Sequence, residues 1–183
     1  LFPLLGIVDI RAAAAPYAHP IIYLFFGGFL LALAMERWNL HRRIALGLVG
    51  MMGTQPSRIV GGFMVAAAFL SMWVSNTATA LMMLPIALSV TSLLEAQAQS
   101  TEDKEHAATF TLVLLLAVAY SATIGGLGTL IGTPPNALLA AFLSQTYDVR
   151  IGFGEWMLIG VPVVIVGVPL AWFLMTRVIF RLK

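Results

Sequence analysis

The chain contains no cysteine and little charge, and both absences limit what it can be. Without cysteine, neither a disulfide framework nor thiolate chemistry is available. Charged residues make up only 10% of the 183 residues, whereas a soluble domain carries about 25%. Hydrophobic residues reach 60%, and helices are the commonest way for so apolar a chain to satisfy its backbone in a bilayer. The composition therefore indicates an all-α integral membrane protein, organised as a polytopic helical bundle.

Charged residues are also absent from two long stretches. None falls in residues 59–94 and none in residues 107–147, whereas charges gather in residues 37–43, 95–105 and 177–183. We therefore expect the two stretches to lie in the membrane and the clusters to lie in water or among lipid headgroups. The formal charge of +2 is small, and the basic residues stand at segment ends where membrane topology explains them, so no nucleic-acid partner is expected.

Residues 1–57 predict a scaffold region. Residues 1–10 are apolar but shorter than the roughly 20 residues that a crossing helix needs, so we interpret them as the end of a span in a fragment of a longer chain. Residues 21–35 predict a span. Residues 44–52 are again too short to cross, and we expect them to lie along the cytoplasmic surface as an amphipathic helix.

Residues 58–94 form an apolar run that is nearly twice as long as one crossing and too short for two crossings with a turn. This length predicts a re-entrant hairpin with Ser-Asn-Thr, residues 75–77, at its tip. The alternative is one long tilted helix in which serine and threonine hydroxyls bond to carbonyls of their own helix. We expect residues 95–106 to form a solvated polar loop.

Residues 107–143 form a second overlong run, interrupted by Gly-Thr-Pro-Pro-Asn at residues 132–136. Two successive prolines cannot continue a helix, so the run predicts a broken transmembrane helix. Residues 156–180 predict the last span, and residues 58–183 together form the predicted transport region. Gly125, Gly126 and Gly128 could cradle a phosphate in a soluble enzyme, but no strand precedes them and no lysine follows. Close helix packing is the favoured interpretation.

The positive-inside rule predicts the orientation of the chain. If residues 58–94 form a hairpin, one face carries eight of the ten Lys and Arg residues and the other carries two. We expect the first face to be cytoplasmic, so that the hairpin enters from the cytoplasm. The eight are Arg37, Arg42, Arg43, Arg58, Lys104, Arg177, Arg181 and Lys183, and the two are Arg11 and Arg150.

The interruptions carry oxygen ligands rather than charge. Serine hydroxyls, an asparagine carbonyl and unwound backbone carbonyls suit a small hard cation such as sodium, while helix N-termini suit an anion. Ser71 stands four residues before Ser75, so on a continuous helix both hydroxyls could face one ion beside Asn76. Taken alone, Ser71 is also a common helix-packing residue in membranes, and its assignment depends on the other two.

The Ser-Asn-Thr-Ala-Thr motif at residues 75–79 and the Gly-Thr-Pro-Pro-Asn motif at residues 132–136 resemble those of the divalent anion:sodium symporters. That family carries dicarboxylates, citrate or sulfate, and the resemblance covers nearly the whole chain. It implies a sodium site and contacts to an anionic substrate. The implied sodium ligands are Ser71, Ser75, Asn76 and the backbone of Gly132, and the implied substrate contacts are Ser75, Asn76, Thr77, Thr133 and Pro134.

The resemblance also implies the larger assembly. Family members consist of two inverted halves, act as homodimers with an elevator-like movement, and lie in the plasma (inner) membrane as multi-pass proteins. Only the first half would be present here. The proline pair resembles that of dicarboxylate carriers, so a C4-dicarboxylate such as succinate is the favoured substrate, with sodium as the coupling ion and no other cofactor.

Two other functions remain open from the sequence. A sodium-independent anion permease or channel would share the interrupted helices and would tolerate replacement of sodium by choline. A membrane enzyme fits less well, because catalysis generally needs a positioned acid, base, nucleophile or metal, and the predicted spans hold no ionisable partner for their hydroxyls and amides. We therefore expect a transporter rather than an enzyme.

Overall fold

The computed structural model describes residues 3, 5–14, 17, 20–51, 55–97, 100–180 and 182. All regular structure in these residues is helical and no strand occurs among them, which confirms the all-α fold. The α-helices are α1 (Ile10–Ala14), α2 (Pro20–Arg37), α3 (Leu40–Met51), α4 (Pro56–Ser71), α5 (Asn76–Gln97), α6 (Thr101–Gly126), α7 (Pro134–Tyr147) and α8 (Phe153–Phe173), and α8 continues as a π-helix over Leu174–Ile179.

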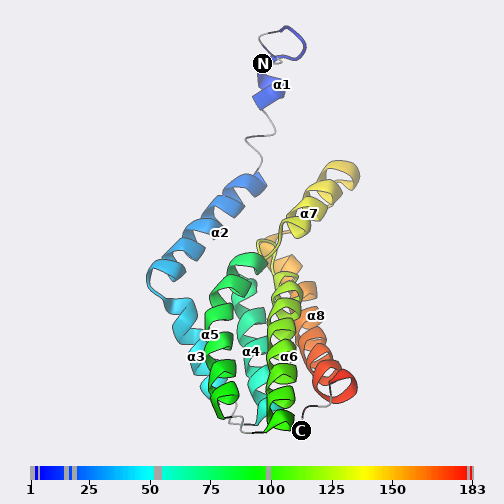
Figure 1. Ribbon diagram of the computed structural model, residues 1–183. Coiled ribbons are helices and arrows are strands. Elements are labelled where there is room, and N and C mark those ends of the chain that lie inside the picture. Colours follow the sequence, from blue (N-terminus) through cyan, green and yellow to red (C-terminus); the bar gives the residue numbers. More distant parts are fainter. Residues whose placement is uncertain are drawn as a thin grey trace.

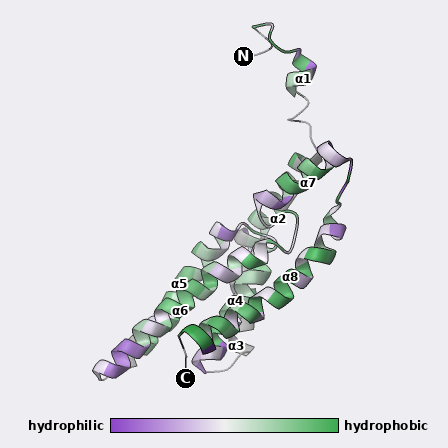
Figure 2. Ribbon diagram, turned by 90° about the vertical axis from the view of Figure 1, so that its right-hand side faces the viewer, coloured by the Kyte–Doolittle hydropathy of each residue, from purple (hydrophilic) through white to green (hydrophobic). Residues whose placement is uncertain are grey.

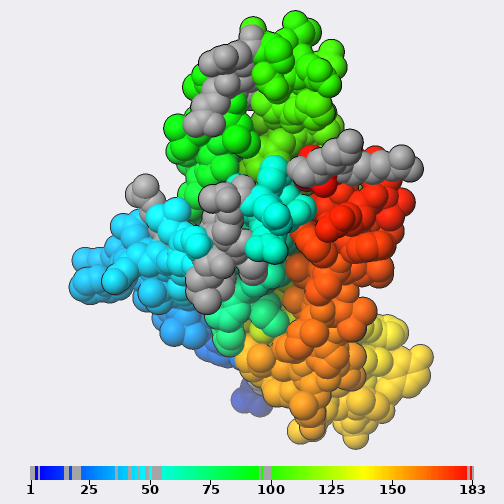
Figure 3. Space-filling model, turned by 90° about the horizontal axis from the view of Figure 1, so that it is seen from below, coloured from blue at the N-terminus to red at the C-terminus, as the bar shows by residue number. Residues whose placement is uncertain are grey.

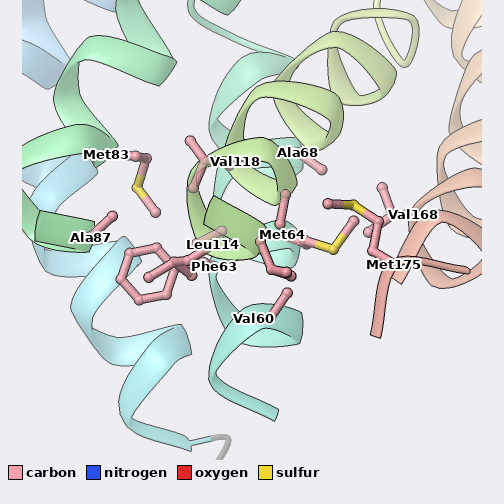
Figure 4. Packing of buried hydrophobic residues seen from close by; sticks show 14 of the residues in the cluster. Val60, Phe63, Met64, Ala68, Met83, Ala87, Leu114, Val118, Val168 and Met175 are labelled. Carbon is pink, nitrogen blue, oxygen red and sulfur yellow. The ribbon is translucent and has the colours of Figure 1, made fainter. Parts of the chain in front are cut away.

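Helix α4 lies in the middle of the bundle, between α3, α5, α6 and α8 (Figure 1). From Ile59 to Leu70 its side chains are apolar, and most of these residues are buried, whereas Val65 and Phe69 are exposed. Phe63 and Met64 of α4 pack with Leu114 of α6, Met83 of α5 and Met175 beyond α8 (Figure 4). The core of the protein is thus built around the first arm of the predicted hairpin.

The chain reverses direction between α4 and α5. Helix α4 ends at Ser71 and α5 begins at Asn76, and the start of α4 and the end of α5 lie at the same end of the bundle (Figure 1). This break excludes the single long helix that was the alternative. The 16 residues of α4 span about 24 Å, which is less than the hydrocarbon thickness of roughly 30 Å.

Three helices are long and apolar enough to cross a membrane, at residues 76–94, 101–126 and 153–179 of the described chain. Helix α4 is too short to cross the membrane, as expected for a re-entrant arm. Helix α5 is one of the three long helices, so its length does not distinguish a re-entrant arm from a full crossing. The division of the chain into a scaffold region and a transport region stays a prediction.

The interpretation of residues 95–106 as a solvated loop was wrong. Helix α5 continues to Gln97 and α6 begins at Thr101, so most of this polar stretch is helical. Ser100 and Asp103 form a capping box: the Ser100 hydroxyl accepts from the Asp103 N–H, and the Asp103 carboxylate accepts from the Ser100 N–H, both at 3.0 Å. Figure 2 shows the polar ends of α5 and α6 extending beyond the apolar bundle.

The predicted broken helix consists of α6 and α7, separated by residues 127–133. Pro134 and Pro135 are the first two residues of α7. At this position the missing N–H of proline removes no intrahelical hydrogen bond. Helix α7 points away from the bundle before α8 returns along it (Figure 1). The last predicted span, 156–180, corresponds to α8 and its π-helical continuation, with Pro162 and Pro169 inside α8.

Helices α2 and α3 are joined by a tight turn in which Asn39 adopts a φ of 49°. Helix α3 begins at Leu40, four residues before the expected surface helix, so residues 41–43 belong to it. Near its middle, α2 contacts the break after α6: a Cβ on Gly28 would lie 2.9 Å from the Ile131 side chain. Ile131 thus connects α2 with the α6–α7 break. Helix α2 corresponds to the predicted span 21–35, but its apolar part, Ile22–Met35, is shorter than the three helices that are long enough to cross.

Five of the ten basic residues belong to opposite ends of the molecule. Arg58 in α4, Lys104 in α6 and Arg177 after α8 belong to helix ends that lie together in the view from below (Figure 3). Arg11 in α1 and Arg150 between α7 and α8 belong to the opposite end (Figure 1). The predicted orientation also counts Arg37 and Arg43, and the α2–α3 turn that carries them lies part-way along the bundle (Figure 1). The cytoplasmic assignment stays a prediction.

Helices α4 and α6 approach most closely at Gly125. A Cβ at this position would overlap the backbone of Ala68, which confirms the packing interpretation of this glycine. We expect Gly125→Ala to lower the free energy of unfolding by about 1–3 kcal/mol, because backbone atoms would have to move. Thermal unfolding of the purified protein in detergent measures the change. Gly27→Ala in α2, where a Cβ meets nothing within 4 Å, is the matched control and should not be destabilised.

Candidate functional site

The two breaks in the helices meet at Thr129. This side chain is fully buried, and its hydroxyl donates a hydrogen bond to the carbonyl of Met72 in the hairpin tip. The same hydroxyl oxygen accepts from the N–H of Gly132 at 3.1 Å. One side chain therefore joins residues 72–75 to residues 127–133, and it satisfies one backbone group in each. Sequence analysis gave Thr129 no role, because a contact across 57 residues leaves no local pattern.

Asn136 donates hydrogen bonds to backbone carbonyls at the break after α6. It lies in the first turn of α7 and is 4% exposed. Its two amide hydrogens donate to the carbonyls of Gly126 and Thr129, both at 2.8 Å. The last carbonyls of a helix lack intrahelical donors, and in a membrane such groups must be paired within the protein. The asparagine of the Gly-Thr-Pro-Pro-Asn motif thus stabilises the break that its prolines create.

Ser71 and Asn76 lie together at the base of the hairpin tip. The Ser71 hydroxyl donates to Asn76 Oδ1 at 2.6 Å, so the last residue of α4 is bonded to the first residue of α5. Helix α4 ends at Ser71, so Ser71 and Ser75 are not related by one turn of a continuous helix, and the expectation that both hydroxyls face one ion stays a prediction. Gly126 lies against Asn76, and a Cβ on this glycine would overlap Oδ1.

Gly132 lies where backbone carbonyls converge. A Cβ on this buried residue would lie 2.5 Å from the Gly126 carbonyl oxygen and 3.0 Å from the Ser71 carbonyl oxygen. The structure therefore brings three of the four predicted sodium ligands, Ser71, Asn76 and Gly132, into one neighbourhood. All the groups that meet there are neutral oxygen or nitrogen atoms.

The predicted substrate contacts lie on the more open side of the same region. Ser75 and Thr77 are exposed at the start of α5, and the Ser75 hydroxyl accepts from the Ala78 N–H at 3.3 Å as a helix cap. Thr133 is half-buried and Pro134 is exposed at the start of α7. These four residues come from the N-terminal ends of α5 and α7.

The two N-termini differ in what they offer an anion. The first residues of α7 are prolines without N–H groups, and the Asn136 N–H donates to the Thr133 carbonyl at 3.2 Å. Helix α5 begins with non-proline residues, so its first N–H groups and its positive dipole end remain suitable for a carboxylate. No ionisable side chain occurs in either break, so this dipole is the principal local source of positive potential.

Thr79 has a buried hydroxyl with no hydrogen-bond partner among the described residues. It lies in the first turn of α5, three residues after Asn76 and therefore on the same side of the helix. Other buried helical hydroxyls, those of Thr91, Ser121 and Thr176, donate to carbonyls one turn back. Thr79 is the last residue of the Ser-Asn-Thr-Ala-Thr motif, but no role was predicted for it. Its spacing of three residues from Asn76 was the signal that could have indicated one.

Comparison with known proteins agrees with this geometry. The chain matches the family model described as citrate transporter (CitMHS) over residues 1–183. Relatives named sodium-dependent dicarboxylate transporter SdcS, from Staphylococcus aureus strain USA300 and from Staphylococcus saprophyticus, are each 44% identical to it over 181 residues. These alignments cover 99% of this chain and 35% of each relative, so the chain spans about a third of their length. The helices and these relatives together identify a multi-pass membrane protein.

Removing the Thr129 hydroxyl tests whether the two breaks depend on it. We expect Thr129→Val to lower the free energy of unfolding by about 2–4 kcal/mol, because the Met72 carbonyl and the Gly132 N–H both lose a buried partner. Thermal unfolding in detergent measures the loss. Thr123→Val is the control, since that exposed hydroxyl bonds only to the Ala119 carbonyl of its own helix. Equal stability of the two variants would contradict the role of Thr129.

Proposed function

Because the chain belongs to the citrate transporter family, we propose that it contributes half of the site of a sodium-coupled transporter for a divalent organic anion. A C4-dicarboxylate such as succinate is the favoured substrate, supported by the name of the SdcS relatives. The observation that carries the proposal is the meeting of Ser71, Asn76 and Gly132 where two interrupted helices touch. Breaks in membrane helices are where many transporters bind ions and solutes.

The proposed sodium site uses neutral oxygen atoms. Asn76 Oδ1, the Ser71 hydroxyl and the carbonyls that approach Gly132 are hard donors of the kind that bind small cations. The unpartnered Thr79 hydroxyl lies on the same side of α5 and adds one further oxygen. Binding of a cation here would hold the end of α4, the start of α5 and the α6–α7 break in one arrangement.

The proposed anion site lies at the start of α5. Ser75, Asn76 and Thr77 offer a hydroxyl, an amide and backbone N–H groups at the positive end of a helix dipole. Thr133 and Pro134, at the N-terminal end of α7, are assigned to the same anion site by the family resemblance. Moving the two carboxylates of a dianion into a low-dielectric site costs electrostatic free energy, and a nearby sodium ion would offset part of that cost. Shared residues between the two sites provide a direct physical reason for coupling.

The remaining parts of the proposal follow from the family resemblance. The complete protein would hold a second, inverted half, form a homodimer and lie in the plasma membrane, with lipid around its apolar faces. Its movement would carry the site between the two sides of the membrane. Transport of the substrate without chemical change, rather than catalysis, is the proposed activity.

Uptake of labelled succinate into proteoliposomes that contain the full-length protein tests this function. We expect uptake with an inward sodium gradient and none when choline replaces sodium, because the cation is needed to assemble the anion site. Sodium-independent uptake would instead support a permease or channel. Citrate and sulfate are tested in parallel, and an absence of sodium-dependent uptake with all three anions would refute the proposal.

Asn76→Ala should weaken sodium and substrate binding together, since the proposed sites share this side chain. We expect the sodium concentration for half-maximal uptake and the succinate KM each to rise at least about fivefold, as for loss of one hydrogen bond to a charged ligand. Ser92→Ala in the same helix, whose exposed hydroxyl bonds only to Ser89, is the control. An unchanged sodium requirement would remove Asn76 from the ion site.

A further inference from the structure

The indole of Trp156 holds a carbonyl of the α6–α7 break. Trp156 lies in the first turn of α8, and its Nε1–H donates to the Leu127 carbonyl oxygen at 3.0 Å. Leu127 is the residue directly after α6, so its carbonyl has no partner in a continuing helix. Asn136 pairs with the Gly126 carbonyl on one side of this turn, and Trp156 pairs with the next carbonyl from the α8 side.

Gly160 brings the backbone of α8 against the same turn. A Cβ on this buried residue would lie 2.5 Å from the Leu127 carbonyl oxygen and 2.9 Å from that of Gly128. No side chain could be accommodated there without movement of one backbone or the other. Gly160 follows Trp156 by four residues, so both contacts come from one face of α8.

The same face of α8 also reaches the hairpin tip. The ring of Phe153 lies 6.4 Å from the ring of Trp73, centroid to centroid, with an interplanar angle of 38°. Trp73 belongs to residues 72–75, the turn between α4 and α5. Phe153, Trp156 and Gly160 therefore form one surface, here called the α8 support face, that contacts both breaks.

The support face acts on the carbonyls that border the proposed sodium site. Gly126 presents its carbonyl toward Gly132 and Asn136, while the next two carbonyls face α8. Because neighbouring peptide planes share a Cα atom, fixing the Leu127 carbonyl restricts the direction of the Gly126 carbonyl. We propose that the α8 support face fixes the geometry of the ion site from behind, with Trp156 as a positioning residue. This inference rests on the proposed sodium-coupled function.

Trp156→Phe, compared with Trp172→Phe, tests the inference. The Trp172 indole also donates to a backbone carbonyl, that of Ser57 at 2.7 Å, but at the start of α4, away from the breaks. In full-length protein in proteoliposomes, we expect Trp156→Phe to raise the sodium concentration for half-maximal succinate uptake about three- to tenfold, the effect of one lost hydrogen bond. The maximal rate at saturating sodium should change less, and Trp172→Phe should leave the sodium requirement unchanged.

A second measurement separates this inference from the proposed function. Sodium should raise the unfolding temperature of the purified wild-type protein, and Trp156→Phe should require more sodium for the same rise. If succinate uptake by the wild-type protein does not depend on sodium, the proposed function is refuted. If the wild type is sodium-dependent and Trp156→Phe has the wild-type requirement, or if Trp172→Phe shifts it equally, the positioning role is refuted. Phe153→Leu, which reduces the contact with Trp73, gives the same test should Trp156→Phe fail to fold.

Discussion

A helix that stops inside a membrane leaves carbonyl groups without donors, and the arrangement of this protein depends on how the end of α6 is paired. Asn136 supplies two amide hydrogens and Trp156 supplies an indole N–H. Thr129 then connects the break to the hairpin tip through Met72. Helices α7 and α8 supply donors to the break and the hairpin tip supplies an acceptor, so the break holds its shape only when all three are in place.

This pairing also decides which groups are left for a ligand. Asn136 and Thr129 are engaged with backbone atoms, whereas the Thr79 hydroxyl has no partner among the described residues and Asn76 is held only by Ser71. Gly126 and Gly132 leave room for this arrangement, since a side chain at Gly126 would overlap Asn76 and one at Gly132 would crowd the Gly126 and Ser71 carbonyls. Under the proposed function, the two motifs would divide these roles, with the start of α7 mainly structural and the start of α5 mainly available for binding.

The sequence was informative where the physical constraint is local. Lengths of apolar runs and the proline pair located both breaks and the all-helical fold, because a missing N–H and a bilayer thickness act on neighbouring residues. Contacts between distant segments were not predictable in this way, and Thr129 and Trp156 were missed for that reason. The polar stretch before α6 was misassigned because composition suggested water, while the Ser100 capping box permits a helix that extends into it.

The absence of ionisable side chains in both breaks has an electrical consequence. Residues 72–75 and 127–133 carry only neutral groups. A membrane potential acts on each elementary charge that moves through it, by about 2.3 kcal/mol per 100 mV. Under the proposed function, these residues would add no side-chain charge of their own to that movement. The voltage sensitivity arising here would then be set by the transported ions and substrate, and it would report their net charge rather than a property of the polypeptide.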